Sequence, residues 1–249
     1  MEEIEKLKIE NEQLKKVNKN KSDIISITAH QLRTSLSALK WILKMFIDKD
    51  VGSLSTEQNE LIEKAYNGNE RMLVLVNDLL TLSHAEDVSI SYNFQSVDIL
   101  HLLEQVLFDF YGETNKKRIE LIFLKPDEDI PLVKCDEEMI RVVVQNLIEN
   151  SIKYSDKGGK VFVTLVEKNN SIEISVRDNG IGIEDSDKDN IFKKFFRAKN
   201  AVEKDNIGSG LGLFTTKDIL EKHGGKIWFE NKDDKGTTFT FMLPINQTL

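Results

Sequence analysis

The stretch Ile25–Phe46, ISITAHQLRTSLSALKWILKMF, decides how the first part of the chain folds. Its apolar residues recur at alternating steps of four and three positions, at Ile25, Ala29, Leu32, Leu36, Leu39, Leu43 and Phe46. This spacing is a heptad seam, which is typical of a helix packed in a bundle. We therefore expect one long helix from residue 3 to about residue 48, and its first part, residues 1–21, is predicted to be a coiled-coil lead-in.

A second helix is predicted beyond the turn at Asp48–Ser53, where Ser55 or Thr56 can cap its first turn. Its apolar positions include Leu61, Ala65, Met72, Leu75, Val76, Leu79 and Leu80. Two long helices joined by a short turn form an antiparallel hairpin, and a lone hairpin would leave much of each apolar stripe exposed to water. Pairing two hairpins into a four-helix bundle buries both stripes, so we expect a homodimer.

Composition limits the class of protein. The 249 residues are 40% hydrophobic and 31% charged, which is enough for a globular chain of one or two domains. A net charge of -8 argues against nucleic acid as a partner. The longest apolar candidate, Met72–Leu82, contains Asn77 and Asp78, so we expect no membrane segment. A single cysteine, Cys135, fits a reducing compartment. The N-terminus is acidic and unlike a signal peptide. We therefore expect a cytoplasmic chain or the cytoplasmic part of a larger one.

The pattern changes after about Val88, where strand-like and helical segments begin to mix. Strands are expected at Ile119–Phe123, Lys160–Glu167, Ser171–Arg177, Lys226–Glu230 and Thr237–Leu243. Helices are expected at Ile99–Tyr111, Glu137–Tyr154 and about Leu211–His223. This order of elements predicts an α/β sandwich with helices on one face of a sheet.

Helical geometry places His30 well away from the centre of the heptad seam. Thr34 lies four residues further on and shares this outward face, as do Ile27, Ala38 and Trp41. An exposed imidazole offers a nitrogen nucleophile at neutral pH. A surface histidine without chemistry, or one that packs within the bundle, is the simpler explanation when the helical geometry is taken by itself.

The segment 146–154, NLIENSIKY, carries polar residues on one side of a predicted helix. Asn146, Asn150 and Lys153 lie at positions i, i+4 and i+7, which share one helical face. Two neutral carboxamides can bind a hard cation through oxygen, and a lysine can offset the charge of a phosphate. An amphipathic helix with a polar face is the equally simple structural alternative.

Two glycine-rich segments follow. DNGIGI, at 178–183, comes directly after a predicted strand, so Asp178 could accept a hydrogen bond from an exocyclic amine while the glycines allow close approach to the backbone. An ordinary turn has the same pattern. GSGLGL, at 208–213, opens a predicted helix whose free N–H groups can hold phosphate oxygens. No strand leads into these glycines and no Gly-Lys-Ser/Thr is present, which argues against a Rossmann or Walker A site.

A polar, lysine-rich segment, Glu184–Ile207, separates the two glycine-rich segments and contains IFKKFFR at 191–197. The segment GTTFTF, at 236–241, leads into the last predicted strand.

Taken in order, these motifs resemble the core of sensor histidine kinases over roughly residues 22–244. ITAHQLRTSL, at 27–36, is similar to the phosphoacceptor box, and the later segments are similar to the N, G1, F, G2 and final glycine boxes of that family. The resemblance implies a dimerisation and phosphoacceptor hairpin at 22–89. It also implies a GHKL-type ATP-binding domain with a mixed sheet at 95–249.

The resemblance also assigns an activity and its residues. His30 would be phosphorylated by ATP, and the phosphoryl group would pass to an aspartate on a separate response regulator. Asp178 would bind the adenine amino group, and Asn146 with Asn150 would hold Mg²⁺. Lys153 and Arg197 would offset charge on the γ-phosphoryl group. Further contacts to ATP would come from Tyr154, Gly180, Gly182, Ile183, Gly208, Ser209, Gly210, Leu211, Gly212 and Thr238.

The sequence departs from the family pattern at two positions. Gln31 replaces the usual acidic residue after the histidine; because glutamine cannot act as a general base, we expect slower autophosphorylation rather than none. Ser35 replaces a common proline, so the helix should be straighter there. Thr34 is retained, and the resemblance implies that it supports phosphatase activity towards the regulator.

Two alternatives stay open. The chain could be a catalytically silent, kinase-like scaffold or phosphatase, with Gln31 marking the loss of catalysis. It could also be a GHKL ATPase, although such enzymes carry a glutamate base where this chain has Asn146.

Overall fold

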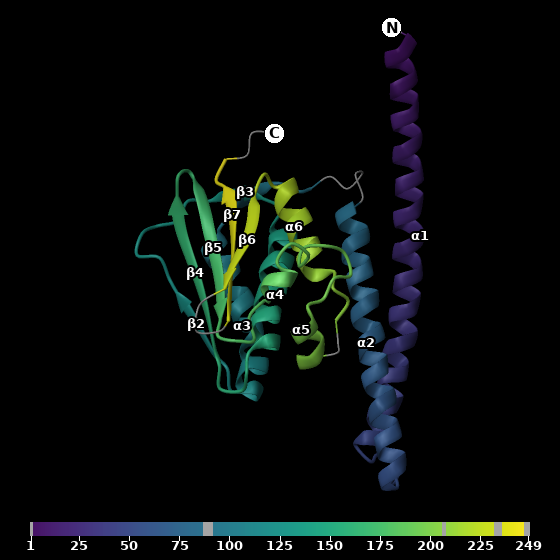
Figure 1. Ribbon diagram of the computed structural model, residues 1–249. Helices are drawn as coiled ribbons and strands as arrows, with labels where there is room; N and C mark the ends of the chain where they lie inside the picture. The colour runs from purple at the N-terminus through teal and green to yellow at the C-terminus, as the bar shows by residue number, and fades with distance from the viewer. Residues whose placement is uncertain (1, 87–91, 206–207, 232–235, 247–249) are drawn as a thin grey trace. The chain divides into compact units, whose positions relative to one another are not determined.

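The computed structural model describes residues 2–86, 92–205, 208–231 and 236–246 (Figure 1). The chain divides into two compact units: a helical one, chiefly Met1–Ser91, and an α/β one from Tyr92 onward. The predicted succession of a helical hairpin and an α/β fold is therefore confirmed.

The helical unit consists of α1 (Glu2–Ile47) and α2 (Thr56–Glu86), which form an antiparallel hairpin. Ser55 caps α2: its hydroxyl accepts a hydrogen bond from the Gln58 amide at 3.2 Å, while the Ser55 amide donates to Gln58 Oε1 at 2.9 Å. This reciprocal capping box satisfies amides that an uncapped helix would leave without partners. The single long helix predicted across Ser35 is confirmed.

The hairpin buries only part of its heptad seam. Ala29 and Leu43 are buried against α2, whereas Leu32 and Leu39 remain 45% and 44% exposed. Among the buried residues Asn69 is polar, and its Nδ2 donates to the Leu36 carbonyl of α1 at 2.9 Å. The described part of one hairpin therefore leaves apolar surface uncovered.

The α/β unit is built on a five-stranded mixed sheet of order β2-β4-β5-β7-β6, in which only β2 and β4 pair in parallel. The strands are β2 (Glu120–Leu124), β4 (Lys160–Lys168), β5 (Ser171–Asp178), β6 (Lys226–Asn231) and β7 (Thr237–Pro244). Two shorter strands that the sequence did not predict, β1 (Gln95–Val97) and β3 (Val133–Cys135), pair with each other.

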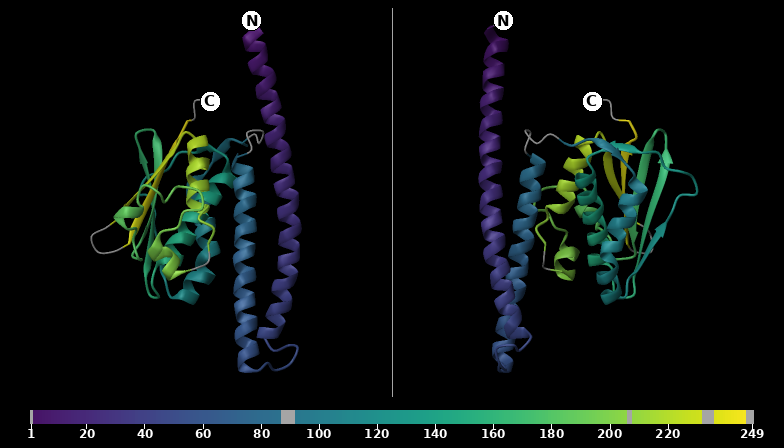
Figure 2. Two further views of the ribbon diagram at one scale, coloured as in Figure 1. Left: turned by 45° about the vertical axis from the view of Figure 1, so that its right-hand side comes forward. Right: turned by 180° about the vertical axis from the view of Figure 1, so that it is seen from behind.

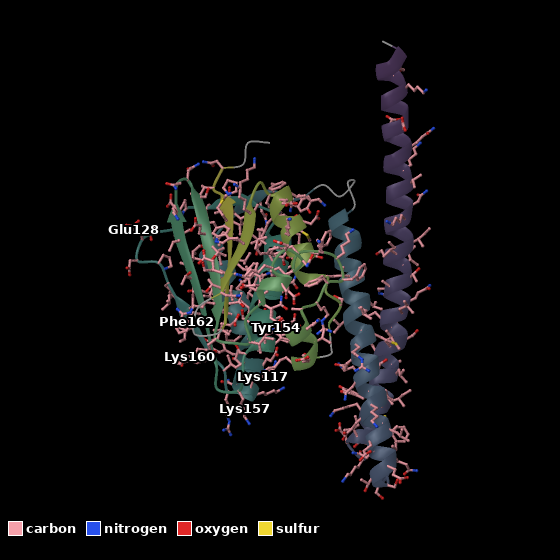
Figure 3. The ribbon with its side chains drawn as sticks, viewed as in Figure 1. Lys117, Glu128, Tyr154, Lys157, Lys160 and Phe162 are labelled. Carbon is pink, nitrogen blue, oxygen red and sulfur yellow. The ribbon has the colours of Figure 1, made fainter. Side chains whose placement is uncertain are left out.

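Three helices, α3 (Ile99–Lys117), α4 (Glu137–Tyr154) and α6 (Gly212–Lys222), cover one face of the sheet (Figure 2). Between them and the sheet lies the core, to which alternate residues of β4, β5 and β7 contribute. The other face carries partly exposed residues such as Phe162 on β4, labelled in Figure 3, whose ring lies 5.2 Å from the Arg177 guanidinium. The predicted sandwich with helices on one face is confirmed.

Aspartates start two of these helices. Asp98 accepts from the His101 amide at 3.0 Å, and Asp136 accepts from the Met139 amide at 3.2 Å. Such N-caps satisfy orphan amides and complement the helix dipole. The Asp136 amide in turn donates to Nε2 of the buried His223 at 3.1 Å, which ties the start of α4 to the end of α6.

The segment between β5 and α6 contains two short elements, the 3₁₀ turn η1 (Asp185–Asp187) and helix α5 (Lys199–Lys204). Neither was predicted from the sequence. Among the described residues no helix has the length and apolar character needed to cross a membrane.

Candidate functional site

His30 lies exposed on α1, and Ile27 and Trp41, which lie before and after it on the same helix, are 60% and 65% exposed. The Thr34 hydroxyl donates to the His30 carbonyl at 3.0 Å, and the Ser35 hydroxyl donates to the Gln31 carbonyl at 3.1 Å. Both hydroxyls are therefore directed back onto the helix. No hydrogen bond joins the His30 ring to any residue that the structure describes, so the ring is presented to solvent on a continuous helix.

In the α/β unit, Asp178 is the most constrained of the predicted site residues. It ends β5 and is buried, with only 7% of its surface exposed. Its Oδ1 accepts from the Gly180 amide at 2.8 Å and from the Thr237 amide at 3.2 Å, while Oδ2 lies 3.5 Å from the Ser151 hydroxyl. One carboxylate oxygen is thus fully engaged by the backbone and the other is held only weakly.

Burial raises the pKa of the Asp178 carboxyl, and the hydrogen bonds from Gly180, Thr237 and Ser151 oppose this shift. A buried carboxylate that accepts from backbone amides is fixed in orientation. Its Oδ2 retains the capacity to accept a hydrogen bond from a ligand amine.

Glycines make this arrangement possible. A Cβ at Gly180 would lie 2.5 Å from the Tyr154 carbonyl oxygen, and a Cβ at Gly236 would lie 2.3 Å from the Asp178 carbonyl oxygen. The backbones of β5, α4 and β7 therefore approach one another more closely than any side chain allows. Gly182 adopts φ +70°, and the Ile183 amide beside it donates to Asn231 Oδ1 at 3.2 Å.

The polar face of α4 meets the second glycine-rich segment. Asn146 Nδ2 lies 3.4 Å from both the Gly212 carbonyl oxygen and the Thr216 hydroxyl at the start of α6. The side chain of Asn150, one turn later, is half-buried and has no hydrogen-bond partner among the described residues. Asn146 thus lies beside the second glycine-rich segment, and Asn150 follows it by one turn of α4.

The segment that leads into α6 comprises Gly208, Ser209, Gly210 and Leu211, and α6 begins at Gly212. A Cβ at Gly210, where φ is +74°, would lie 2.7 Å from the Phe195 carbonyl carbon. Gly210 is therefore required for contact with the IFKKFFR segment, in addition to any role with a ligand.

Two cations of the site contact α5 and the residue that follows it. Lys153 Nζ lies 3.4 Å from Asp205 Oδ2. The Arg197 guanidinium donates to the Ala201 carbonyl at 3.4 Å and also to the Asp205 carbonyl. Tyr154, labelled in Figure 3, ends α4; burial raises the pKa of its phenol, and the adjacent Arg197 opposes the shift. Lys153, Tyr154 and Arg197 therefore form one cluster.

Thr238 does not join Asp178. It pairs with Arg177 in the β5–β7 register, and its side chain lies on the face of the sheet opposite to Phe239 and Phe241. Its neighbour Thr237 is buried on the helix-covered face and donates its amide to Asp178. Sequence reasoning missed Thr237; the alternation with Phe239 and Phe241 was the available signal, since residues two apart share a face of a strand.

Two protein-family models match the chain. "His Kinase A (phospho-acceptor) domain" matches residues 20–87, and "Histidine kinase-, DNA gyrase B-, and HSP90-like ATPase" matches residues 135–247. The first contains His30, and the second contains the Asn146, Asp178 and Arg197 segments.

The sensor histidine kinase WalK of Bacillus subtilis (strain 168) is 33% identical over 241 residues, which cover 93% of this chain and 38% of that protein. The Acinetobacter baumannii histidine kinase AdeS is 26% identical with a TM-score of 0.60, over 88% of this chain and 98% of that structure. The catalytic domain of histidine kinase ThkA is 31% identical with a TM-score of 0.55, over 61% of this chain and 96% of that structure.

The fold, the site and these matches define a helical phosphoacceptor domain joined to an ATP-binding domain of the GHKL class. The chain belongs to the sensor histidine kinases of two-component systems, which confirms the resemblance drawn from the motifs. It spans about two fifths of WalK, and from 29% to 64% of the lengths of eight curated relatives.

Proposed function

We propose that this chain is a sensor histidine kinase core that phosphorylates its own His30 from ATP and passes the phosphoryl group to an aspartate of a response regulator. The observation that carries the proposal is Asp178, a buried carboxylate with Oδ1 engaged by two backbone amides and Oδ2 open to a donor. The exocyclic amine of adenine is such a donor. The exposed His30 in the same chain supplies a nucleophile.

The remaining predicted contacts fit a nucleotide placed against Asp178. Gly180 and Gly182 let the purine approach the backbone. Ile183 follows Gly182 in the chain, and the Tyr154 carbonyl lies against Gly180. The segment Gly208–Gly212 offers amides to phosphate oxygens at the start of α6. Thr238, which lies on the other face of the sheet, has no part in this proposal; Thr237 replaces it by holding Asp178.

Mg²⁺ is part of the proposal, with Asn146 and Asn150 as its protein ligands. Both carboxamides face the same side of α4, and Asn146 contacts α6 through its nitrogen, which leaves its oxygen for a cation. A bound Mg²⁺ would neutralise part of the phosphate charge. Asn146 cannot deprotonate water, which supports phosphoryl transfer over hydrolysis of the gyrase type.

In the proposed transfer an imidazole nitrogen of His30 forms a bond to the γ-phosphorus while the bond to the bridging oxygen breaks and ADP leaves. Lys153 and Arg197 stabilise the charge on the γ-phosphoryl oxygens and the leaving phosphate. The imidazole must also lose a proton. Gln31 can accept a hydrogen bond that orients the ring but cannot take this proton, which must pass to solvent water, so we expect a slow reaction.

The proposal extends to the partners. Leu32 and Leu39 are half exposed in one hairpin, which supports a homodimer with a four-helix bundle. The domain limits of 22–89 and 95–249, the lead-in at 1–21 and a cytoplasmic location remain predictions. Thr34 lies one turn from His30 and supports a second activity, dephosphorylation of the regulator.

Gln31 favours one alternative, a catalytically silent scaffold or phosphatase with the same fold. The two proposals differ in whether His30 is ever phosphorylated, because both retain nucleotide binding. A GHKL ATPase would instead release phosphate without labelling the chain.

The test incubates the chain with γ-labelled ATP and Mg²⁺ and assays acid-labile, alkali-stable label. We expect label in the parent, none in His30→Ala, and full label in the control His101→Ala, which removes an exposed helical histidine of the α/β unit. Nucleotide binding without label in the parent would select the silent scaffold. Label that persists in His30→Ala would contradict the assignment of His30.

A further inference from the structure

The residue that follows α5 holds both cations that the proposed function assigns to phosphate. The Asp205 carboxylate forms an ion pair with Lys153 at 3.4 Å, and the Asp205 carbonyl accepts from Arg197. The Ala201 carbonyl, one turn earlier, also accepts from Arg197 at 3.4 Å. Three oxygens at one end of α5 therefore face a lysine and an arginine, as the oxygens of a phosphate group would.

This contact is sheltered from solvent. The Lys153 side chain is 16% exposed and that of Asp205 is 31% exposed. Water screens such a pair less than it screens a fully exposed one. A phosphate that approaches Lys153 meets a carboxylate of like charge, and the two anions compete for one ammonium group.

We propose that Asp205 is an internal competitor for the nucleotide phosphates, and that its carboxylate lowers the affinity of the site for ATP. The inference rests on the proposed function for the phosphate-binding role of Lys153 and Arg197. When ATP binds, a phosphate replaces the Asp205 carboxylate at Lys153. Breaking the ion pair costs free energy, and this cost raises the apparent dissociation constant for ATP. A ligand without phosphates leaves the pair intact.

A second link between α5 and the end of α4 provides a matched control. Lys204, the last residue of α5, forms an ion pair with Asp156, two residues beyond Tyr154, and α5 lies beside the end of α4 (Figure 2). This link also contains one carboxylate and one lysine, but it does not involve Lys153 or Arg197. Breaking it loosens α5 and removes one negative charge without releasing a phosphate-binding cation.

The test compares Asp205→Asn with the parent by calorimetric titration of the full chain with Mg²⁺–ATP, adenosine and tripolyphosphate. Asparagine keeps the size of the side chain and the backbone carbonyl that accepts from Arg197. We expect ATP and tripolyphosphate to bind about threefold to tenfold more tightly, since the pair is half-buried, and adenosine affinity to stay unchanged. Asp156→Asn should leave all three affinities within about twofold of the parent.

A double variant locates the effect. In a Lys153→Met background, Asp205→Asn should tighten ATP binding less than it does in the parent, because the ammonium group for which the two anions compete is absent and only direct repulsion between carboxylate and phosphate remains. Unchanged or weaker ATP binding in Asp205→Asn, an equal gain in Asp156→Asn, or an undiminished gain without Lys153 would each overturn the inference.

Failure of the inference and failure of the proposed function give different results. A parent chain that binds neither ATP nor adenosine contradicts the proposed function. Tripolyphosphate still tests the inference in that case, because it needs only the cations: a gain in Asp205→Asn upholds the competition, and no gain refutes it.

Discussion

The helical hairpin and the ATP-binding domain hold their functional groups by contacts of very different range. Around His30, the hydroxyls of Thr34 and Ser35 each bond to a carbonyl four residues earlier. Around Asp178, the hydrogen bonds reach Ser151 and Thr237, which lie 27 and 59 residues away in the chain. One region is organised by the helix itself, and the other exists only once the whole sheet has formed.

This difference follows the chemistry that each group is proposed to perform. A nucleophile that must meet two partners, a nucleotide and a receiver domain, has to be reachable, and a helix surface presents it without further support. A group that selects one base must have its orientation fixed in advance, which requires surrounding backbone. Substitutions should therefore act through chemistry in the hairpin and through binding in the ATP-binding domain.

The largest effect is expected for Asp178→Asn. Asparagine can still accept from the Gly180 and Thr237 amides, but its NH₂ group replaces Oδ2, so a donor would face the adenine amine. We expect ATP affinity to fall by about tenfold to 150-fold, the range for a hydrogen bond to a charged group. Calorimetric titration with ATP measures it.

The same variant should not lose stability. Because burial raises the pKa of Asp178, its ionisation is less favourable in the folded chain than in the unfolded one. Stability from this group is therefore greatest below the ordinary pKa and falls as pH rises through the raised value. At pH 7 the neutral asparagine avoids that loss, so urea unfolding should show an equal or higher free energy. A clear destabilisation would mean that the carboxylate has a structural role.

In the hairpin, Gln31→Glu tests the chemical side of the comparison. An exposed carboxylate beside His30 can accept the imidazole proton, so we expect autophosphorylation to accelerate by about tenfold. This acceleration is smaller than a general base usually gives, because the glutamine of the parent can already orient the ring. ATP affinity should not change. Single-turnover labelling measures the rate, and Ser35→Glu, which adds the same charge one turn away, should give no acceleration.

Elements with strong local signals could be predicted from the sequence. The heptad seam predicted α1, and the periodicity of Glu137–Tyr154 predicted α4 with its observed bounds. The position of Asp178 at the end of a strand also followed from alternation. In each case the pattern repeats over several residues within one element, so the local sequence is enough to predict that element.

Features that depend on register or on distant partners could not be predicted. The strands β1 and β3 have three residues each, too few to show alternation. Alternation with Phe239 and Phe241 indicates the face of Thr237, but the contact of its amide with Asp178 depends on how β7 pairs with β5. The contact between Lys153 and Asp205 joins residues of α4 and the segment after α5, a polar stretch without periodicity. These are properties of the folded α/β unit rather than of any single segment.

A buried histidine tests how far long-range contacts stabilise the ATP-binding domain. His223 Nδ1 donates to the Ile219 carbonyl at 2.7 Å, and its Nε2 accepts from the Asp136 amide, 87 residues away. Burial lowers the pKa of His223, while the Ile219 carbonyl and the Asp136 charge oppose the shift. The folded ring is therefore neutral where the unfolded histidine, with an ordinary pKa near 6.5, begins to bind a proton.

Stability should consequently fall as pH drops below about 6.5 and continue to fall to the lowered pKa of the folded state, by at most about 1.4 kcal/mol per pH unit. The groups that face the ring in this region are Tyr92, Asp136, Asp218 and Lys222. Urea unfolding followed at Trp228 between pH 7.5 and 5.5 measures the slope. His223→Gln can accept from Asp136 but does not titrate, and a slope equal to that of the parent would rule out His223 as its source.

The smallest effect is expected in the hairpin, at the capping box of α2. Ser55→Ala removes the hydroxyl that accepts from the Gln58 amide, but that amide is exposed and water replaces the lost partner. We expect a loss of about 0.5–1 kcal/mol in unfolding free energy, the lower part of the range for an N-cap. Because the contact spans three residues, the loss should be confined to the hairpin, and ATP affinity should match that of the parent.

Thermal unfolding and ATP titration of the same sample check both parts, and Ser53→Ala, two residues earlier in the turn, is the matched control. A loss of ATP affinity in Ser55→Ala would show that the start of α2 is coupled to the nucleotide site, against the local character that its contacts indicate.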